Sequence, residues 1–178
     1  MAKWRPGDRR EATSSMVRVD QAGEYGATRI YAGQLAIMGD RVPMARAIAG
    51  MAEQEERHRA FFDRMIAERG VRPTLLQPFW DVAGFALGAV TAAIGPKAAM
   101  ACTVAVETEI DLHYQQQLDE LADGDPELSA AVLDFQAEEL EHKEAALEHG
   151  AEQAIGYPVM SALIRAGCRV AIAASKRI

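Results

Sequence analysis

The sequence of 178 residues contains few cysteines, few aromatic residues and no long uncharged stretch. Its two cysteines, Cys102 and Cys168, stand far apart and match no zinc or redox spacing, so we expect small buried thiols in a reducing compartment. The longest uncharged run, residues 82–96, is shorter than the roughly 18 apolar residues that cross a bilayer, so no membrane span is expected. The N-terminal stretch MAKWRPGDRR lacks the apolar core of a signal peptide.

An excess of basic residues is also absent, because the formal net charge is −7. Binding to a phosphate backbone needs a basic surface, so nucleic acid is not an expected partner. Alanine is abundant and runs of β-branched residues are scarce, which favours helices over strands. The length suits one domain with a single sizeable core. We therefore expect an all-α protein whose residues 1–178 form one domain, with residues 1–11 as a flexible N-terminus.

Glycine, proline and aspartate divide the rest of the chain into six predicted helices. Four of these are long and suit a four-helix bundle: residues 12–38, 44–69, 97–122 and 126–154. The segment 79–94 is apolar nearly all round, so it is either buried or in contact with lipid. The last segment, 159–178, carries Arg165 and Arg169 one turn apart and no acidic residue. A helix facing anionic headgroups and a plain solvated helix explain that pattern equally well.

The same acidic helix occurs twice in the sequence, once as GEYGATRIYAGQL (residues 23–35) and once as ETEIDLHYQQQL (residues 107–118). Each copy is followed, at nearly the same separation, by a Glu-x-x-His motif. Alignment of the two units pairs glutamates, tyrosines, glutamines and histidines: Glu24 with Glu107, Tyr31 with Tyr114, Gln34 with Gln117, Glu55 with Glu139, and His58 with His142. The chain therefore contains a duplicated helix pair.

The duplicated glutamates and histidines have the pattern of a dinuclear metal centre. Helical residues three apart project to the same side, so the carboxylate and imidazole of each motif can share a cation. A single Glu-x-x-His indicates a salt-bridged surface, whereas two copies, each preceded by an equivalent Glu, match the ligands of ferritin-like dinuclear proteins. Four facing carboxylates need cations to neutralise them, and oxygen and imidazole donors suit iron or manganese. We expect two iron ions bound by Glu24, Glu55, His58, Glu107, Glu139 and His142.

Other polar residues near these ligands have weaker signals. Tyr31 and Tyr114 should face the metals, either as hydrogen-bonded core residues or in proton or electron transfer, with His113 as a helper. Glu138 is expected on or near a solvated face or, alternatively, as a residue that orients a ligating histidine, and Asp20 could have the same orienting role. The remaining acids near the motifs and the last histidine are expected on solvated faces: Glu53, Glu56, Glu109, Glu141, Glu144 and His149.

From about Met16 to the C-terminus the sequence closely resembles the demethoxyubiquinone hydroxylases of ubiquinone biosynthesis. Four stretches carry the resemblance: RVDQAGEYGATRIYAGQLAIM (18–38), ACTVAVETEIDLHYQQQL (101–118), EELEHKEAALEHGAE (138–152) and AGCRVAIAASKRI (166–178). The resemblance places the iron ligands of the family on the same six residues. It implies a ferritin-like four-helix bundle with two additional helices, one apolar and one basic and C-terminal. The implied enzyme is a monooxygenase that uses O2, and electrons ultimately from NADH, to hydroxylate a polyprenylated methoxy-methyl-benzoquinol.

The implied substrate gives the two additional helices a role. Residues 79–94 would guide the isoprenoid tail towards the metals, and the basic C-terminal helix would help to dock the protein peripherally on the cytoplasmic face of a bacterial inner membrane. His113 and Tyr114 are the candidate catalytic residues, and no residue is assigned to nicotinamide. Other ubiquinone-biosynthesis proteins and a second copy of the chain are candidate partners. Alternatives are a ferritin-like iron-storage or peroxide-scavenging protein, a related tRNA-modifying hydroxylase, and a metal-free helical interaction protein.

Overall fold

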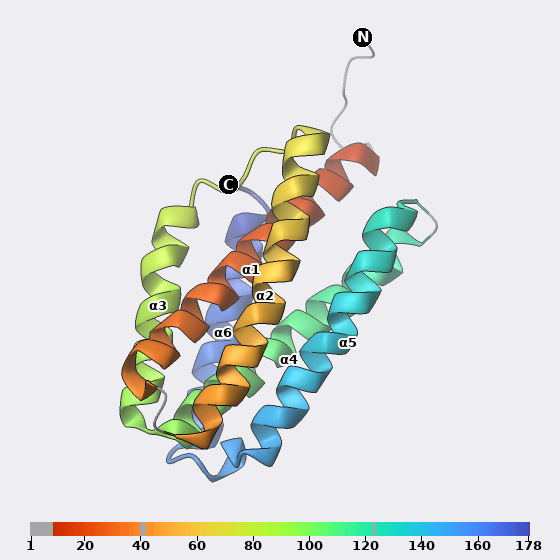
Figure 1. Ribbon diagram of the computed structural model, residues 1–178. Coiled ribbons are helices and arrows are strands. Elements are labelled where there is room, and N and C mark those ends of the chain that lie inside the picture. Colours follow the sequence, from red (N-terminus) through yellow and green to blue (C-terminus); the bar gives the residue numbers. More distant parts are fainter. Residues whose placement is uncertain (1–8, 40–41, 123) are drawn as a thin grey trace.

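The computed structural model describes residues 9–39, 42–122 and 124–178, and its regular elements in these ranges are all helices. In chain order they are α1 Arg9–Met38, α2 Pro43–Arg69, α3 Gln77–Ile94, α4 Pro96–Leu121, α5 Pro126–Glu148, the 3-10 turn η1 Ala151–Gln153, and α6 Tyr157–Ser175. The pairs α1–α2 and α4–α5 form the bundle, while α3 packs on α1 and α6 packs on α4 (Figure 1). The predicted all-α, ferritin-like four-helix bundle with two additional helices is confirmed.

The helix ends follow the glycines, prolines and aspartates of the sequence. Proline stands in the first turn of α2, α3, α4, α5 and α6, where its missing N–H costs nothing. The carboxylate of Asp125 accepts a hydrogen bond from the Leu128 amide at 3.2 Å and so caps α5. The predicted helix 126–154 is too long, because Gly150 adopts a left-handed conformation with φ of 81° and α5 ends at Glu148.

The structure describes only part of the N-terminus that was expected to be flexible, residues 1–11. Residues 1–8 lie outside the described residues. The backbone of residues 9–11 belongs to the first turn of α1, and the flexibility of this end stays a prediction.

Glycines bring α1 and α3 into close contact. A Cβ atom on Gly88 would lie 1.9 Å from the Ile30 carbonyl oxygen, and one on Gly33 would lie 2.1 Å from the Phe85 carbonyl oxygen. No larger residue fits at either position without separating the two helices. Arg29 of α1 and Asp81 of α3 add an ion pair at 2.5 Å across the same contact.

Two apolar clusters fill the bundle, one towards each end. One contains Tyr31, Ile48, Met51 and Met100 and the other contains Phe62, Met65, Tyr114 and Leu128, all fully or almost fully buried. The middle of each bundle helix, between these clusters, carries the duplicated glutamates and histidines. The bundle thus closes its polar centre from both ends with apolar layers.

A buried carboxylate holds α6 against α4. Glu109, expected on a solvated face, is 4% exposed, and its Oε1 atom accepts bonds from Arg165 Nε at 2.6 Å and Arg169 Nη1 at 2.8 Å. That prediction for Glu109 is wrong, because α6 covers this side of α4. The two arginines therefore have an internal partner, which neither the headgroup nor the solvated-face explanation included. The other acids expected to be solvated are exposed: Glu53, Glu56, Glu141 and Glu144.

Helix α6 also bears on the expectation that no segment is long enough to span a membrane. By length and composition alone, Tyr157–Ser175 is long and apolar enough to do so. In the folded chain, however, α6 lies along α4 with Ile164 buried between them and two arginines paired to Glu109. This arrangement favours a position of α6 on the surface of the bundle over a membrane-spanning one.

Candidate metal centre

The four bundle helices bring together the six predicted ligands. Helix α1 supplies Glu24 and α4 supplies Glu107, while α2 and α5 each supply one Glu-x-x-His motif. None of the six residues is more than 2% exposed. Their ligand atoms form two overlapping groups, each within 4.8 Å: Glu24, Glu55, His58 and Glu139, and Glu55, Glu107, Glu139 and His142. Glu55 and Glu139 belong to both groups, as expected for residues that bridge two ions.

The centre contains buried polar atoms that have no hydrogen-bond partner among the described residues. They include His58 Nδ1 and five carboxylate oxygens: Glu24 Oε2, both oxygens of Glu55, Glu107 Oε2 and Glu139 Oε1. Leaving such atoms unpaired in a protein interior is costly. Several carboxylate oxygens without partners and one imidazole nitrogen point at a common centre. Oxygen and imidazole nitrogen are the ligand atoms that a hard or intermediate cation prefers. The residues therefore fit a pair of divalent metal ions.

Each histidine presents Nδ1 to the centre and Nε2 to an outer partner. His58 Nδ1 lies 3.1 Å from Glu139 Oε1, and His142 Nδ1 lies 3.0 Å from Glu139 Oε2. On the outer side His58 Nε2 lies 3.0 Å from Glu138 Oε2, which agrees with the orienting role predicted for Glu138. His142 Nε2 lies 2.9 Å from Gln54 Oε1. An Nε2–H that donates outward leaves Nδ1 free to bind a metal.

The two buried tyrosines bond across the repeat. Tyr31 donates its hydroxyl hydrogen to Glu107 Oε1 at 2.7 Å, and Tyr114 donates to Glu24 Oε1. Each phenol therefore contacts the lone glutamate of the other helix pair. Burial, together with the neighbouring carboxylate, raises the pKa of both phenols well above the ordinary value, so both remain protonated donors. Both phenols face the centre, as predicted.

Asp20 binds the turn of α4 that carries Tyr114. Its Oδ1 atom lies 3.1 Å from His113 Nε2, and its Oδ2 atom accepts a bond from Gln117 Nε2 at 2.7 Å. Asp20 thus contacts His113 in place of the ligating histidine that the sequence had suggested. His113 is next to Tyr114 in the chain. It is connected to the ligands indirectly, through Asp20 and Tyr114. His149, expected on the surface, is half-buried and bonds the Ala145 carbonyl.

Protons can replace cations in the metal-free centre. Burial, followed by repulsion from Glu139 and the other acids, raises the pKa values of Glu55 and Glu107 well above the ordinary value. Burial opposes both of the following shifts. The nearby carboxylates of Glu139 and Glu24 raise the pKa of His58 to about 10, and the nearby imidazoles of His142 and His58 lower the pKa of Glu139 to about 2. The centre therefore holds protons that metal ions would displace.

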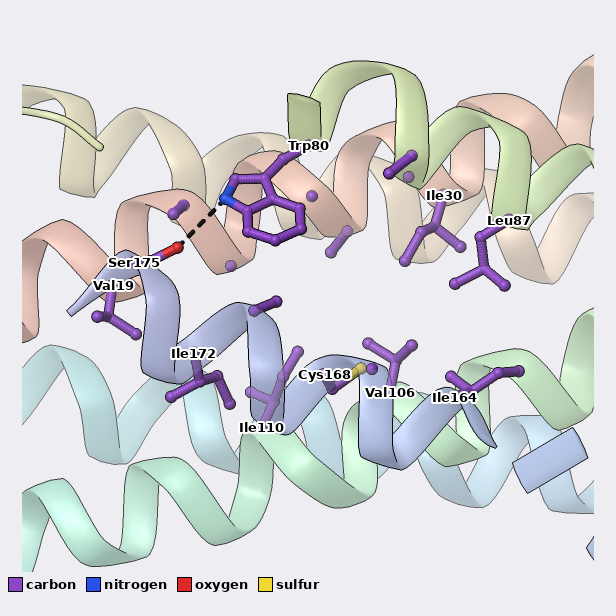
Figure 2. Close-up of a pocket in the computed structure, with 18 of the residues that line it drawn as sticks. Val19, Ile30, Trp80, Leu87, Val106, Ile110, Ile164, Cys168, Ile172 and Ser175 are labelled. Atoms are coloured by element: carbon purple, nitrogen blue, oxygen red, sulfur yellow. Dashed lines mark hydrogen bonds between the residues drawn. The ribbon is translucent and has the colours of Figure 1, made fainter. Parts of the chain in front are cut away.

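An apolar groove of about 430 Å³ lies between α1, α3, α4 and α6 beside the centre (Figure 2). Its walls include Ile30 from α1, Leu87 from α3, Val106 from α4 and Ile164 from α6. At one end Trp80 Nε1 donates to Ser175 Oγ at 3.2 Å and so links α3 to α6. The volume is typical of a small-molecule site.

A second, smaller cavity, which is too small to hold a water molecule, lies between the groove and the ligand Glu107. It shares Ala27, Ile30 and Val106 with the groove, and its other walls are Tyr31, Thr103 and the ligand Glu107. The sequence gives little sign of the groove, because its walls come from four helices that are distant in the chain.

The prediction of small buried thiols is confirmed for Cys102 but not for Cys168. Cys102 is fully buried, and Cys168 is partly buried in the wall of the groove. Burial raises the pKa of each thiol to about 12, so both stay protonated at neutral pH.

Comparison with known proteins identifies relatives of the chain. Residues 11–175 match the family model described as ubiquinone biosynthesis protein COQ7. The 3-demethoxyubiquinol 3-hydroxylase of Rhodospirillum rubrum is 51% identical over 175 residues, which cover 97% of this chain and 82% of that protein. The mitochondrial NADPH-dependent 3-demethoxyubiquinone 3-hydroxylase of Homo sapiens is 49% identical over 173 residues, covering 95% and 79%. The mitochondrial 5-demethoxyubiquinone hydroxylase of Saccharomyces cerevisiae is 41% identical over 179 residues, covering 92% and 77%. The chain belongs to the COQ7 family of ubiquinone biosynthesis hydroxylases.

Proposed function

We propose that the protein hydroxylates the ring of a demethoxyubiquinol, using O2 and a pair of iron ions held by the six buried glutamates and histidines. The observation that carries this proposal is an apolar groove whose wall residue Val106 stands next to Glu107, at the centre where partnerless carboxylate oxygens converge. The 3-demethoxyubiquinol 3-hydroxylase named among the relatives acts on a substrate of this class. Such a substrate has an apolar isoprenoid tail and a small polar ring, and the groove and the centre match these two parts.

The reaction replaces a ring hydrogen by hydroxyl. One oxygen atom of O2 enters the ring, and the other leaves as water with two electrons and two protons. When bound, the metal ions would activate O2 for this chemistry. We propose a reduced nicotinamide nucleotide as the ultimate electron source; the sequence suggested NADH, whereas the human relative is named as NADPH-dependent.

The side chains around the centre have three tasks in this reaction. The groove binds the tail and excludes water from the ring. Tyr31 and Tyr114 hold protons against Glu107 and Glu24 and remain donors, because their pKa values are raised by burial. Of the two predicted catalytic residues, Tyr114 contacts a proposed ligand, while His113 is bonded to Asp20 and has a positioning role.

We also propose that the protein docks on a membrane through α3 and α6, which flank the groove. Large apolar side chains on both helices are exposed: Phe79, Val82, Val90 and Ile94 on α3, and Val159, Leu163 and Val170 on α6. Exposed apolar surface next to an apolar groove suits a substrate that is dissolved in lipid. The expected location is the cytoplasmic face of a bacterial inner membrane, and further ubiquinone-biosynthesis proteins or a second copy are candidate partners.

The alternative of an iron-storage or peroxide-scavenging protein gives the groove no role. The alternative of a metal-free interaction protein gives no role to the buried carboxylate oxygens that lack hydrogen-bond partners. The net charge of −7 opposes a tRNA substrate.

The direct test combines metal analysis with turnover. Metal-free protein is loaded with ferrous ion without oxygen, reduced, and mixed with a short-tailed demethoxyquinol and O2. We expect two iron ions per chain and a product heavier by one oxygen atom. Glu107→Ala, the control, should lose both iron and product. Iron uptake without oxygen transfer would instead favour storage.

A further inference from the structure

The two halves of the centre have equivalent ligands but different neighbours. The alignment that pairs Glu24 with Glu107 also pairs Asp20 with Thr103 and His113 with Ile30. In the two helices that carry the Glu-x-x-His motifs, the alignment pairs Gln54 with Glu138. At all three positions the titratable residue belongs to the same side of the centre. The duplication therefore predicts a symmetry that the surroundings of the ligands break.

The Glu24 end, defined here by Glu24 and His58, has polar, charged surroundings. Glu138 Oε2 lies behind His58, 3.0 Å from its Nε2, and also pairs with Arg57 Nη2 at 3.1 Å. Asp20, one turn before Glu24, is 2% exposed and binds His113 and Gln117. Two carboxylates beyond the ligands thus face this end.

The Glu107 end, defined by Glu107 and His142, has neutral surroundings. The amide of Gln54 takes the position behind His142 that Glu138 has behind His58. Thr103 and Gln34 both bond the Ala99 carbonyl, at 3.4 Å and 3.1 Å. Thr103 and Ile30 line the small cavity between Glu107 and the groove, and Ile30 is also part of the groove wall.

These differences change how strongly each end attracts a cation. A carboxylate behind a histidine raises the basicity of the ligating nitrogen and typically changes metal affinity by about 10- to 100-fold. An amide fixes the ring orientation but adds no charge. Asp20 places a further carboxylate within one helical turn of Glu24. Cations should therefore bind more tightly at the Glu24 end.

We propose that the two ends have separate tasks: the Glu24 end binds the first and tighter metal ion, and the Glu107 end holds a weaker ion and receives the substrate ring. The second half rests on the proposed function, because it concerns the quinol. Glu138 and Asp20 are positioning residues in this scheme, since each acts on a ligand or its donor and not on the substrate.

The metal half is tested by titrating metal-free protein with Co²⁺ alone against a competing chelator. Wild type should bind two ions in two steps. Glu138→Gln, which copies the neutral partner of His142, should weaken the tighter step by about 10-fold or more. The reciprocal Gln54→Glu should tighten the weaker step. Arg57→Gln is the control, because it removes the cation that contacts Glu138 but keeps the carboxylate. Two equal steps in wild type, or both substitutions altering the same step, would overturn the assignment.

The substrate half needs a readout that does not depend on loaded enzyme. In a Trp4→Phe background Trp80 is the remaining tryptophan, and it lines the groove, so its fluorescence reports binding of a short-tailed benzoquinone to metal-free protein. Thr103→Leu fills the small cavity beside Glu107 and should weaken this binding about tenfold. Val106→Leu, at the wall shared by both cavities, is a second variant.

Asp20→Asn, at the other end, keeps a similar volume and should change quinone binding by less than about twofold. The assignment of ends is wrong if the probe binds Thr103→Leu and Val106→Leu as it binds wild type. It is equally wrong if Asp20→Asn weakens binding as much as they do. A protein that binds no metal would refute the proposed function itself, whereas turnover with two equal metal steps would refute only the division between ends.

Discussion

At the scale of single residues, the centre is a place where protons and cations compete. Burial and repulsion from neighbouring carboxylates raise the pKa values of Glu55 and Glu107. The carboxylates of Glu139 and Glu24 raise the pKa of His58 to about 10, although burial opposes this shift. Metal ions would replace these protons and satisfy the oxygens that lack hydrogen bonds. The same residues thus stabilise the fold by different means in the two states.

This competition predicts how the stability of metal-free protein depends on pH. A raised pKa means that the folded state binds the proton more tightly, so the contribution of His58 is complete below 6.5 and is lost as pH rises towards about 10. Glu55 and Glu107 act in the same direction. Glu139 acts oppositely, and its contribution is lost as pH falls from 4.5 towards about 2. The thermal unfolding midpoint should therefore decrease as pH rises above about 4.5, where Glu55 and Glu107 begin to lose their contribution, and more steeply above about 6.5, where His58 does as well; it should also decrease below about pH 4.5 through Glu139.

Differential scanning calorimetry with and without Mn²⁺ measures this effect. Added Mn²⁺ should offset the alkaline loss, because two divalent cations balance the four carboxylates without protons. A midpoint that rises steadily between about pH 6.5 and about pH 9 in metal-free protein would contradict this explanation of the centre.

At the scale of helices, the position of α6 depends on one buried acid and two exposed bases. Glu109 is 5% exposed in its side chain, whereas Arg165 and Arg169 are 36% and 57% exposed. Removing both arginines leaves a buried carboxylate unpaired, which costs roughly 3–5 kcal/mol, while removing the acid leaves two bases that water can solvate.

We therefore expect Arg165→Met with Arg169→Met to destabilise the protein more than Glu109→Gln. Urea unfolding measures the free energy of each variant, and Arg165→Met alone should have a small effect because Arg169 still contacts Glu109. Equal losses for the double variant and for Glu109→Gln would show that the buried charge is not the cause.

The contact between α1 and α3 makes a second prediction about helices. Gly88→Ala would place a methyl group 1.9 Å from the Ile30 carbonyl oxygen, so α3 must move away from α1 and the groove must change shape. We expect a loss of about 1–3 kcal/mol in the free energy of unfolding.

Gly50→Ala in α2 is the matched control, because no atom lies within 4 Å of its added Cβ. That substitution should stabilise the protein by roughly 0.5–1 kcal/mol. Thermal unfolding compares the two, and equal effects of the same sign would contradict the close approach of α1 and α3.

Helix positions and the ligand set were predictable from sequence because both depend on local spacing. Proline and glycine mark the helix ends, and the duplicated Glu-x-x-His motifs identify the ligands. The error at the end of α5 arose because Gly150 was read as part of a helix and not as its terminator. The repeat itself held a signal for Gln54, since it precedes Glu55 as Glu138 precedes Glu139. The pairing of Glu109 with α6, and the groove, depend on packing between distant segments and leave no local pattern.

At the scale of the whole molecule, the apolar exterior beside the groove predicts membrane binding. Val82 and Val90 on α3 are 67% and 59% exposed, and neither lines the groove. Changing both to aspartate should abolish flotation with liposomes, since charged groups oppose insertion at the lipid interface. Leu87 lines the groove and is unsuitable for this test, because its substitution would alter the cavity as well.

Leu133→Asp provides the control for flotation. Leu133 is 62% exposed on α5, which does not contribute to the groove. This variant should float as wild type does. If Val82→Asp with Val90→Asp floats equally well, the membrane face lies elsewhere or does not exist.

The dinuclear centre requires metal ions between the two helix pairs, and anomalous scattering is the decisive measurement. Crystals soaked anaerobically in ferrous salt should show two peaks at the iron edge. One should lie among Glu24, Glu55, His58 and Glu139, and the other among Glu55, Glu107, Glu139 and His142. Side chains that stay within the bundle with no anomalous peak between them would contradict the dinuclear centre, and with it the proposed chemistry.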